Sequence, residues 1–209
     1  MSPKVEFHFD FGSPNAYLSH KVLPAIAART GVTITYVPVL LGAVFKLTNN
    51  QSPMVQFKGI KNKNEYARIE TDRFVRKHGL DQYERNPHFP VNTIQIMRGA
   101  LVAERDGFFG RYVDQVFHHM WEQPKKMDEA AIIQAALDAS GLNGQAILDG
   151  SQEQSIKDKL IANTEASVAR GTFGSPAFFV GDEMFFGKDR LREVEDEIAS
   201  RVTTARRTA

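Results

Sequence analysis

The stretch FHFDFGSPNAY, residues 7–17, starts as an alternation of apolar and polar side chains and ends as the first turn of a helix. The alternation has the period of two that a half-buried strand shows. Gly12 then releases the chain, Ser13 is a residue type that caps helices, and Pro14 suits the first helical position. The stretch therefore predicts a strand followed directly by a helix. Ser13 is expected at the carboxyl edge of a sheet, where the first N–H groups of the helix favour an anion.

Helix capping alone would explain Ser13, but a second serine-proline stretch favours a functional role for it as well. GTFGSPAFFV, residues 171–180, places the Ser175-Pro176 bond directly before a short apolar strand. A proline at that position indicates a cis bond in a tight turn. Two serine-proline pairs, far apart in the sequence, therefore border predicted strands.

The other predicted strands complete one sheet. A strand at 33–39 follows the first helix, and this strand, helix, strand order implies a right-handed crossover between parallel strands. Strands at 177–180 and 183–186 are separated by a Gly-Asp turn and predict an antiparallel hairpin. Between about residues 42 and 165 strand patterning disappears. Helices are predicted there over 63–78, 92–105, 111–122, 128–139 and 151–169, with a cap at Asp128 and a capping box from Ser151 to Gln154.

This combination resembles the thioredoxin-related disulfide oxidoreductases and kappa-class glutathione transferases, and within them the 2-hydroxychromene-2-carboxylate isomerase family. The resemblance implies an α/β fold in which a thioredoxin-like mixed sheet carries a large all-helical insertion. Residues 1–41 and 170–209 would form the discontinuous thioredoxin-like domain, and residues 42–169 the helical insertion domain. Redox members have cysteines where this chain has Ser13 and Ala16, so disulfide exchange is excluded.

The composition of the chain limits the kinds of partner and the chemistry that can be expected. The 209 residues are 42% hydrophobic, enough for a sizeable core, and 26 basic against 25 acidic residues give a net charge of +1. This balance gives no electrostatic reason to expect nucleic acid or a membrane as a partner, so a small molecule is expected. There is no cysteine, so sulfur chemistry needs a thiol cofactor. Because no secretory or membrane-spanning segment is apparent, we expect a cytoplasmic protein.

The resemblance implies that glutathione is the cofactor. Ser13 would donate its hydroxyl to the glutathione sulfur and favour the thiolate. The backbone of Ser175, before Pro176, would pair with the cysteinyl part. Lys188 and Asp189, at the start of the last helix, would bind the γ-glutamyl end.

Two further matches extend the cofactor site. Asn50 to Pro53 matches the family's Asn-x-x-Pro loop, and Lys63 to Tyr66 matches the Lys-x-x-Tyr sequence that follows it. Lys58 and Lys61 are alternatives to Lys63 within the same basic run.

Candidate substrate contacts come from the helical insertion. In the isomerase family the asparagine of a Phe-Pro-x-Asn-Thr helix start, here Asn92, faces the substrate, although it can equally be a helix cap. Trp121 occupies a helix end where the family often has a large aromatic residue near the substrate, but a packing or dimer role also fits. Lys46 and Arg98 are candidates for the substrate carboxylate. His118 and His119 do not predict a metal site, because adjacent helical residues diverge by about 100° and no carboxylate completes a ligand set.

The implied activity is a glutathione-dependent cis-trans isomerisation in aromatic catabolism. It would convert 2-hydroxychromene-2-carboxylate-type compounds to trans-o-hydroxybenzylidenepyruvate-type products. A kappa-like glutathione transferase and a redox-inactive thioredoxin-like binding protein are the alternatives. Ser175 and Lys188 depart from the family pattern, which usually has an apolar residue and a small or neutral polar residue at these positions. The resemblance also implies a homodimer.

Overall fold

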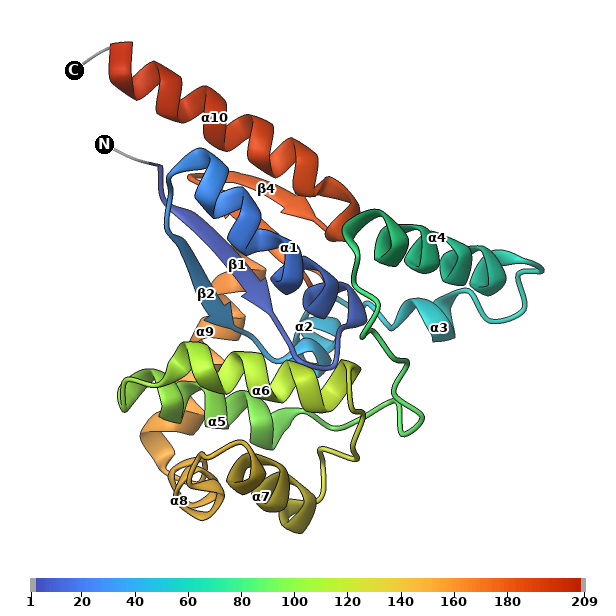
Figure 1. Cartoon of the computed structure of the whole chain (residues 1–209), viewed down its shortest axis with the longest axis vertical. Coiled ribbons are helices and arrows are strands. Elements are labelled where there is room, and N and C mark those ends of the chain that lie inside the picture. Colours follow the sequence, from blue (N-terminus) through green and yellow to red (C-terminus); the bar gives the residue numbers. More distant parts are fainter. Residues whose placement is uncertain (1–2, 208–209) are drawn as a thin grey trace.

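The computed structural model describes residues 3–207 and contains a four-stranded mixed sheet with the strand order β2-β1-β3-β4 (Figure 1). Strand β1 (Val5–Phe9) is parallel to β2 (Ile34–Pro38) and antiparallel to β3 (Ala177–Val180). Strand β4 (Glu183–Phe186) pairs with β3 as a hairpin. The predicted parallel pairing of the first two strands and the predicted hairpin are both confirmed, and β1, which leads to Ser13, lies inside the sheet.

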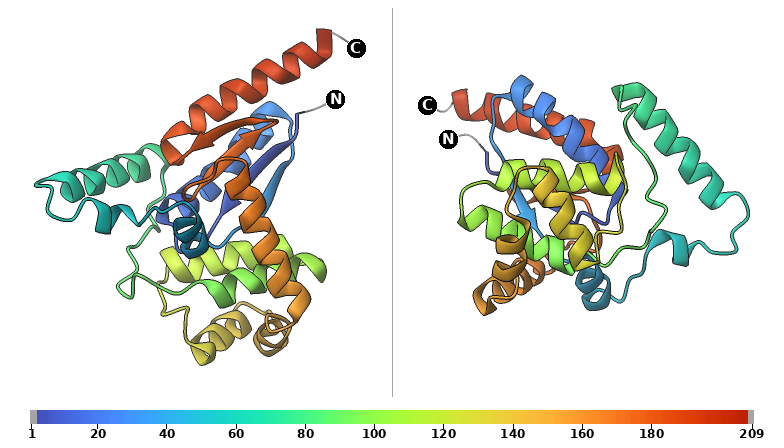
Figure 2. Two further views of the ribbon diagram at one scale, coloured as in Figure 1. Left: turned by 180° about the vertical axis from the view of Figure 1, so that it is seen from behind. Right: turned by 60° about the horizontal axis from the view of Figure 1, so that its bottom comes forward.

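Helices cover both faces of this sheet. Helices α1 (Pro14–Thr30) and α10 (Leu191–Arg207) lie on one face, and α9 (Gln154–Ala169) crosses the other, as the front and back views show (Figures 1 and 2). The remaining helical elements are α2 (Leu41–Leu47), α3 (Pro53–Gln56), α4 (Lys63–His78), α5 (Ile94–Arg105), α6 (Phe109–Trp121), α7 (Ala130–Ala139), α8 (Gly144–Gly150) and the 3-10 turn η1 (Lys188–Arg190). Helix α4 projects to one side of the molecule in every view.

The core is continuous from the sheet into the helical insertion. Phe7 of β1 stacks on Phe178 of β3 with ring centroids 5.3 Å apart. Phe9 lies 5.7 Å from the ring of Phe117 in α6, and Phe11 lies 4.8 Å from the same ring. The three phenylalanines of residues 7–17 are fully buried, so their burial fixes the position of the turn that carries Ser13.

The expectation that β1 is half-buried is wrong. Its polar side chains Glu6 and His8 are only 6% and 4% exposed. Arg170, just after α9, pairs with Glu6 at 2.6 Å and lies over the ring of Phe179 at 3.7 Å. An alternating sequence can therefore line two buried faces when a helix and its terminal arginine cover the polar side.

Several helix boundaries also differ from the prediction. Helix α9 begins at Gln154, and Ser151 belongs to the turn after α8, where its hydroxyl donates to the Leu148 carbonyl at 2.6 Å. The predicted capping box is therefore wrong. Asp128 is not the cap of α7 either, because that helix begins two residues later and its N-cap, Glu129, makes no side-chain cap bond. The short helices α2, α3 and α8 carry too few residues for a periodic pattern to reveal them.

Two histidines are buried in the neutral form. His8 Nδ1 lies 2.8 Å from the Ser167 hydroxyl, which in turn lies 2.8 Å from Thr172 Oγ1. Burial lowers the pKa of His8 to about 4. His119 lies 3.0 Å from the Ala136 carbonyl, and burial, aided by the charge of Lys125, lowers its pKa to about 4 as well.

These histidines should make the protein sensitive to acid. A folded-state pKa below the ordinary value of about 6.5 means that the unfolded chain binds more protons, so stability is lost as the pH falls through this window. Between about pH 7 and about pH 5 we expect each histidine to lower the free energy of unfolding by about 2 kcal/mol. Urea unfolding at the two pH values measures this loss. His8→Asn should reduce it, whereas replacement of the exposed His88 by Asn should not, and equal losses in all three proteins would contradict the assignment.

Among residues 3–207, no helix is long and apolar enough to cross a membrane. The predicted domain division also includes residues 1–2 and 208–209, which lie outside the described part of the chain.

Candidate active site

Ser13 joins the start of α1 to the loop before β3. It is the N-cap of the helix, and its Oγ accepts a hydrogen bond from the Ala16 N–H at 3.2 Å. The same hydroxyl donates to the Ser175 carbonyl at 2.8 Å. The capping prediction is therefore confirmed, and it coexists with a contact to the second serine-proline pair.

The Ser175-Pro176 bond is cis, as predicted, and ties three segments together. The Ser175 hydroxyl accepts a hydrogen bond from the Asp10 N–H at 3.1 Å. On the other side, the Gly187 N–H donates to the Pro176 carbonyl at 3.0 Å. The end of β1, the cis-proline loop and the start of the last helix therefore converge at one edge of the sheet.

Asp10 organises this edge, and sequence reasoning did not identify it as a site residue. Its side chain is fully buried and accepts hydrogen bonds from the Gly12 N–H and the Leu41 N–H, each at 2.7 Å, and from the Thr93 hydroxyl at 3.0 Å. Burial raises the pKa of Asp10, while the three donors oppose that rise. Its position directly after a strand and two residues before a glycine was the available signal, but its distant partners, Leu41 and Thr93, could not be read from the sequence.

Close packing explains two glycines of the site. A Cβ on Gly12 would lie 3.1 Å from the Thr93 methyl carbon and 3.2 Å from Asp10 Oδ1. A Cβ on Gly174 would lie 2.9 Å from the ring of Phe186. A larger side chain at Gly12 would press on Thr93 and Asp10, and one at Gly174 would have to displace the exposed Phe186 ring.

Lys188 and Asp189 lie beside this edge through the Gly187 contact. The Lys188 side chain is only 4% exposed, and its Nζ lies 2.5 Å from Asp189 Oδ1 and 5.0 Å from the centre of the Phe74 ring. The Asp189 side chain is 68% exposed. Both residues lie in the 3-10 turn before α10, and the structure shows them joined as an ion pair.

Asn50 and Lys63 are the two predicted cofactor residues between α2 and α4. Of these two, Asn50 contacts the cis-proline loop. Its Nδ2 donates to the Phe173 carbonyl at 2.8 Å, two residues before Ser175. Lys63 is exposed at the first residue of the projecting helix α4, where its Nζ lies 5.1 Å from the Phe57 ring. Within residues 3–207, no hydrogen bond or ion pair joins Lys63 to Ser13, Ser175 or Asp189. The alternatives Lys58 and Lys61 are exposed in the preceding loop.

The substrate candidates occupy different environments. Trp121 is 3% exposed, and its Nε1 donates at 2.8 Å to the carbonyl of Phe11, two residues before Ser13, which favours the packing role. Asn92 is exposed and its Oδ1 accepts from the Ile94 N–H at 3.1 Å, as a turn residue before α5 does. Lys46 is exposed on α2, whereas the buried Nε of Arg98 has no hydrogen-bond partner among the described residues.

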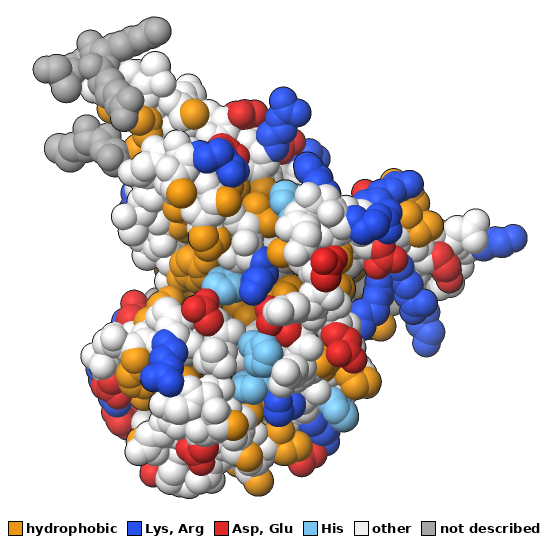
Figure 3. Space-filling model, viewed as in Figure 1, with side chains coloured by type: hydrophobic (Ala, Val, Ile, Leu, Met, Phe, Trp, Pro, Cys, Tyr) orange, Lys and Arg blue, Asp and Glu red, His pale blue; other side chains and the backbone are white. Residues whose placement is uncertain are grey.

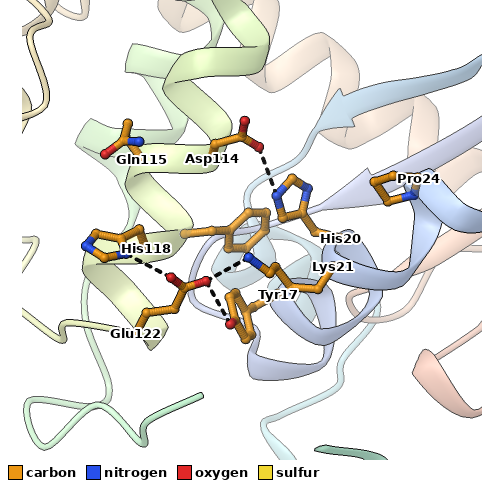
Figure 4. A pocket seen from close by; sticks show the side chains of 9 residues that line it. Tyr17, His20, Lys21, Pro24, Asp114, Gln115, His118 and Glu122 are labelled. Atoms are coloured by element: carbon orange, nitrogen blue, oxygen red, sulfur yellow. Dashed lines mark hydrogen bonds and ion pairs between the residues drawn. The ribbon is translucent and has the colours of Figure 1, made fainter. Parts of the chain in front are cut away.

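A pocket of about 450 Å³ lies between α1 and α6 (Figure 4). Glu122 accepts hydrogen bonds there from the Tyr17 hydroxyl at 2.9 Å and from Lys21 Nζ at 3.0 Å, and lies 2.8 Å from His118 Nδ1. In the space-filling view, histidine and charged side chains gather where these two parts of the molecule meet (Figure 3). Ser13 does not line this pocket, and the carboxylate of Glu122 already has three partners inside it. We therefore interpret it as the polar junction between α1 and the helical insertion.

Comparison with known proteins defines the class. The family model of the DSBA-like thioredoxin domain matches residues 4–199. The chain therefore belongs to the DSBA-like thioredoxin family, and the predicted fold class, a thioredoxin-like sheet with a helical insertion, is confirmed. A probable DsbA oxidoreductase from Streptomyces coelicolor shares the fold with a TM-score of 0.68, at 14% identity over 95% of this chain and 89% of its own.

More similar proteins confirm the predicted resemblance. A 2-hydroxychromene-2-carboxylate isomerase from Pseudomonas putida is 27% identical over 193 residues, 91% of this chain and 92% of the relative. The solved structure of a 2-hydroxychromene-2-carboxylate isomerase matches with a TM-score of 0.79 and 25% identity, covering 98% of each chain. Glutathione S-transferase kappa 1 from Caenorhabditis elegans is 28% identical over 210 residues, covering 93% of this chain and 90% of that protein. The relatives of this chain are therefore named either as isomerases or as a glutathione transferase.

Proposed function

We propose that the protein is a glutathione-dependent cis-trans isomerase acting on 2-hydroxychromene-2-carboxylate-type compounds. The observation that carries the proposal is the contact between the Ser13 hydroxyl and the Ser175 carbonyl, which brings the cap of α1 to the cis-proline loop. The relatives named 2-hydroxychromene-2-carboxylate isomerase support the reaction. Because reduced glutathione is abundant in the cytosol, the proposal also places the protein there.

The residues at the start of α1 fit a bound thiolate. The first turn of this 17-residue helix contains no acidic side chain, so nothing there neutralises its positive end. Ser13 adds a hydroxyl donor at the cap. The backbone around Ser175 and the Lys188-Asp189 pair would hold the peptide part of glutathione, and Asn50 would fix the loop that precedes them.

In the proposed reaction the protein stabilises and positions charge. When bound, glutathione supplies a thiolate that adds reversibly to the unsaturated substrate, so that a double bond becomes a rotatable single bond before elimination. Ser13 would turn its hydroxyl from the Ser175 carbonyl to the sulfur and donate a hydrogen bond to it. Asn92 and the buried Arg98 Nε, which has no hydrogen-bond partner among the described residues, are the proposed groups on the substrate side, with the arginine suited to a carboxylate, while Trp121 holds the Phe11 carbonyl that precedes Ser13.

A spectroscopic assay tests the function. The purified protein is mixed with 2-hydroxychromene-2-carboxylate with and without glutathione, and total free glutathione is measured before and after. We expect equilibration with the trans isomer only when glutathione is present, with no loss of glutathione. No reaction, or the same rate without the thiol, would contradict the proposal.

Kappa-like glutathione transferase activity is the second candidate, favoured by the relative of that name. A transferase would use the same Ser13 site but would release a glutathione conjugate. Product analysis in the same assay separates the two activities, because only a transferase consumes glutathione. The redox-inactive binding protein would bind peptides without turnover of either kind.

We also propose that the protein is a homodimer. Six large hydrophobic side chains are exposed between residues 47 and 69, where the chain leaves the body of the molecule, and a second copy would cover them. They are Leu47, Met54, Val55, Ile60, Tyr66 and Ile69. Light scattering should give twice the 23.4 kDa chain mass, and a monomeric mass would contradict this proposal.

A further inference from the structure

The pairing of Lys188 with Asp189 alters the charge that a ligand would meet beside the cis-proline loop. The Lys188 side chain is only 4% exposed and its Nζ lies 5.0 Å from the centre of the Phe74 ring, so the ammonium group is held at its 2.5 Å contact with Asp189 Oδ1 rather than free to swing into solvent. Asp189 remains accessible, but its negative charge is already compensated. An approaching cation therefore gains less from Asp189 than it would from an unpaired carboxylate.

In a neighbouring pocket, carboxylates are likewise paired with basic side chains. It measures about 420 Å³ and lies between α1, α4 and the start of α10, with Lys188 and Asp189 in its lining. Each of the three carboxylates that line it has a basic partner within ion-pair distance. The pairs are Asp189 with Lys188, Glu70 with Arg73, and Glu195 with Arg29.

The pocket also contains basic side chains beyond these pairs. Lys77 and Arg192 line it as well, and the carboxylate nearest to Arg192, Asp196, lies 3.9 Å away and outside the lining. The lining therefore holds five Lys and Arg side chains against three carboxylates. Lys and Arg side chains are visible along α4 in the space-filling view (Figure 3). The site has an excess of positive charge and no uncompensated carboxylate among its lining residues.

We propose that Lys188 makes this protein recognise the γ-glutamyl end of glutathione by its α-carboxylate and not by its α-ammonium group. This proposal rests on the proposed function. Asp189 is already paired, so the cofactor's ammonium adds little to binding. The surplus basic groups attract the neighbouring α-carboxylate instead. The protein accordingly binds analogues of glutathione that lack the α-amino group of the γ-glutamyl residue. Lys188 is the residue that determines this specificity.

Three thiols test the proposal on the unmodified protein by isothermal titration calorimetry. They are glutathione, glutaryl-cysteinylglycine, which lacks the α-amino group, and 4-aminobutanoyl-cysteinylglycine, which lacks the α-carboxylate. We expect the first two to bind with dissociation constants within about threefold of each other, and the third to bind at least about tenfold more weakly, because it loses a charge-assisted contact. A loss of tenfold or more for the glutaryl compound would overturn the proposal.

Variants at Lys188 test the cause. Lys188→Met places an unbranched apolar side chain in the buried site beside Phe74 and frees Asp189, so removal of the α-amino group should now weaken binding about tenfold. Lys188→Arg should behave as the unmodified protein does. Arg190→Met, at an exposed neighbour that pairs with Glu193, is the matched control and should change neither ratio. An unchanged ratio in Lys188→Met would overturn the role of Lys188.

The outcome also separates this inference from the proposed function. If none of the three thiols binds, the glutathione site itself is wrong. If all bind and the protein discriminates against the glutaryl compound, the glutathione site stands and the inference about Lys188 is wrong. If Lys188→Met does not fold, the comparison of the three thiols on the unmodified protein still decides whether the α-amino group contributes to binding.

Discussion

Replacement of Ser13 by alanine is expected to lower glutathione-dependent turnover about 100-fold, the usual cost of removing one donor to a developing or stabilised anion. The hydroxyl is the side-chain donor at the cap of α1, and its partner in the structure is the Ser175 carbonyl. The variant also loses the bond from the Ala16 N–H, so we expect its free energy of unfolding to fall by about 1 kcal/mol. Turnover should therefore be measured under conditions in which circular dichroism shows both proteins folded.

Ser19 provides the matched control for this prediction. It lies on the same helix and is fully buried, but its hydroxyl donates only within the helix, to the Asn15 carbonyl at 2.8 Å. Ser19→Ala should retain turnover, and Ser13→Thr should recover part of it by restoring a hydroxyl. Undiminished activity in Ser13→Ala would show that Ser13 does not stabilise the thiolate.

Replacement of Asp10 by alanine should cause the largest loss of stability, about 4 kcal/mol in the free energy of unfolding. The change leaves the N–H groups of Gly12 and Leu41 and the hydroxyl of Thr93 without their acceptor in a site that water does not reach. Asp10→Asn should lose less, because its amide oxygen replaces one of the two acceptors. Urea unfolding measures both effects.

Binding measurements should show the same dependence on Asp10. Since the Asp10 side chain sets the relative positions of Gly12, Leu41 and Thr93, glutathione affinity should fall even in conditions where Asp10→Asn is fully folded. Asp106, an exposed carboxylate after α5 that pairs with Arg105, is the control. Asp106→Ala should leave the free energy of unfolding and the glutathione affinity unchanged. Equal losses at the two positions would contradict the role assigned to Asp10.

The sequence by itself determined the local parts of the site. The strand, Gly12, the cap at Ser13 and the first turn of α1 follow one another within a few residues, so periodicity and capping preferences specify them. The cis bond at Pro176 and the hairpin from β3 to β4 were predictable for the same reason. Families share these short motifs, which is why a resemblance that rests on them predicts the fold class correctly.

Only the tertiary structure decided how distant side chains combine. Asp10 finds partners 31 and 83 residues away. Lys63 was predicted beside the cofactor from a local motif, but α4 places it at the outer end of a projecting helix, while Phe74 and Lys77 near the other end of α4 face Lys188 and its pocket. Whether a charged side chain is buried, paired or free depends on which helices pack over it, and that packing is a property of the whole chain. Sequence preferences act over a few residues, so they specified Ser13 and its helix, whereas packing alone buried Lys188 and joined Asp10 to Leu41 and Thr93.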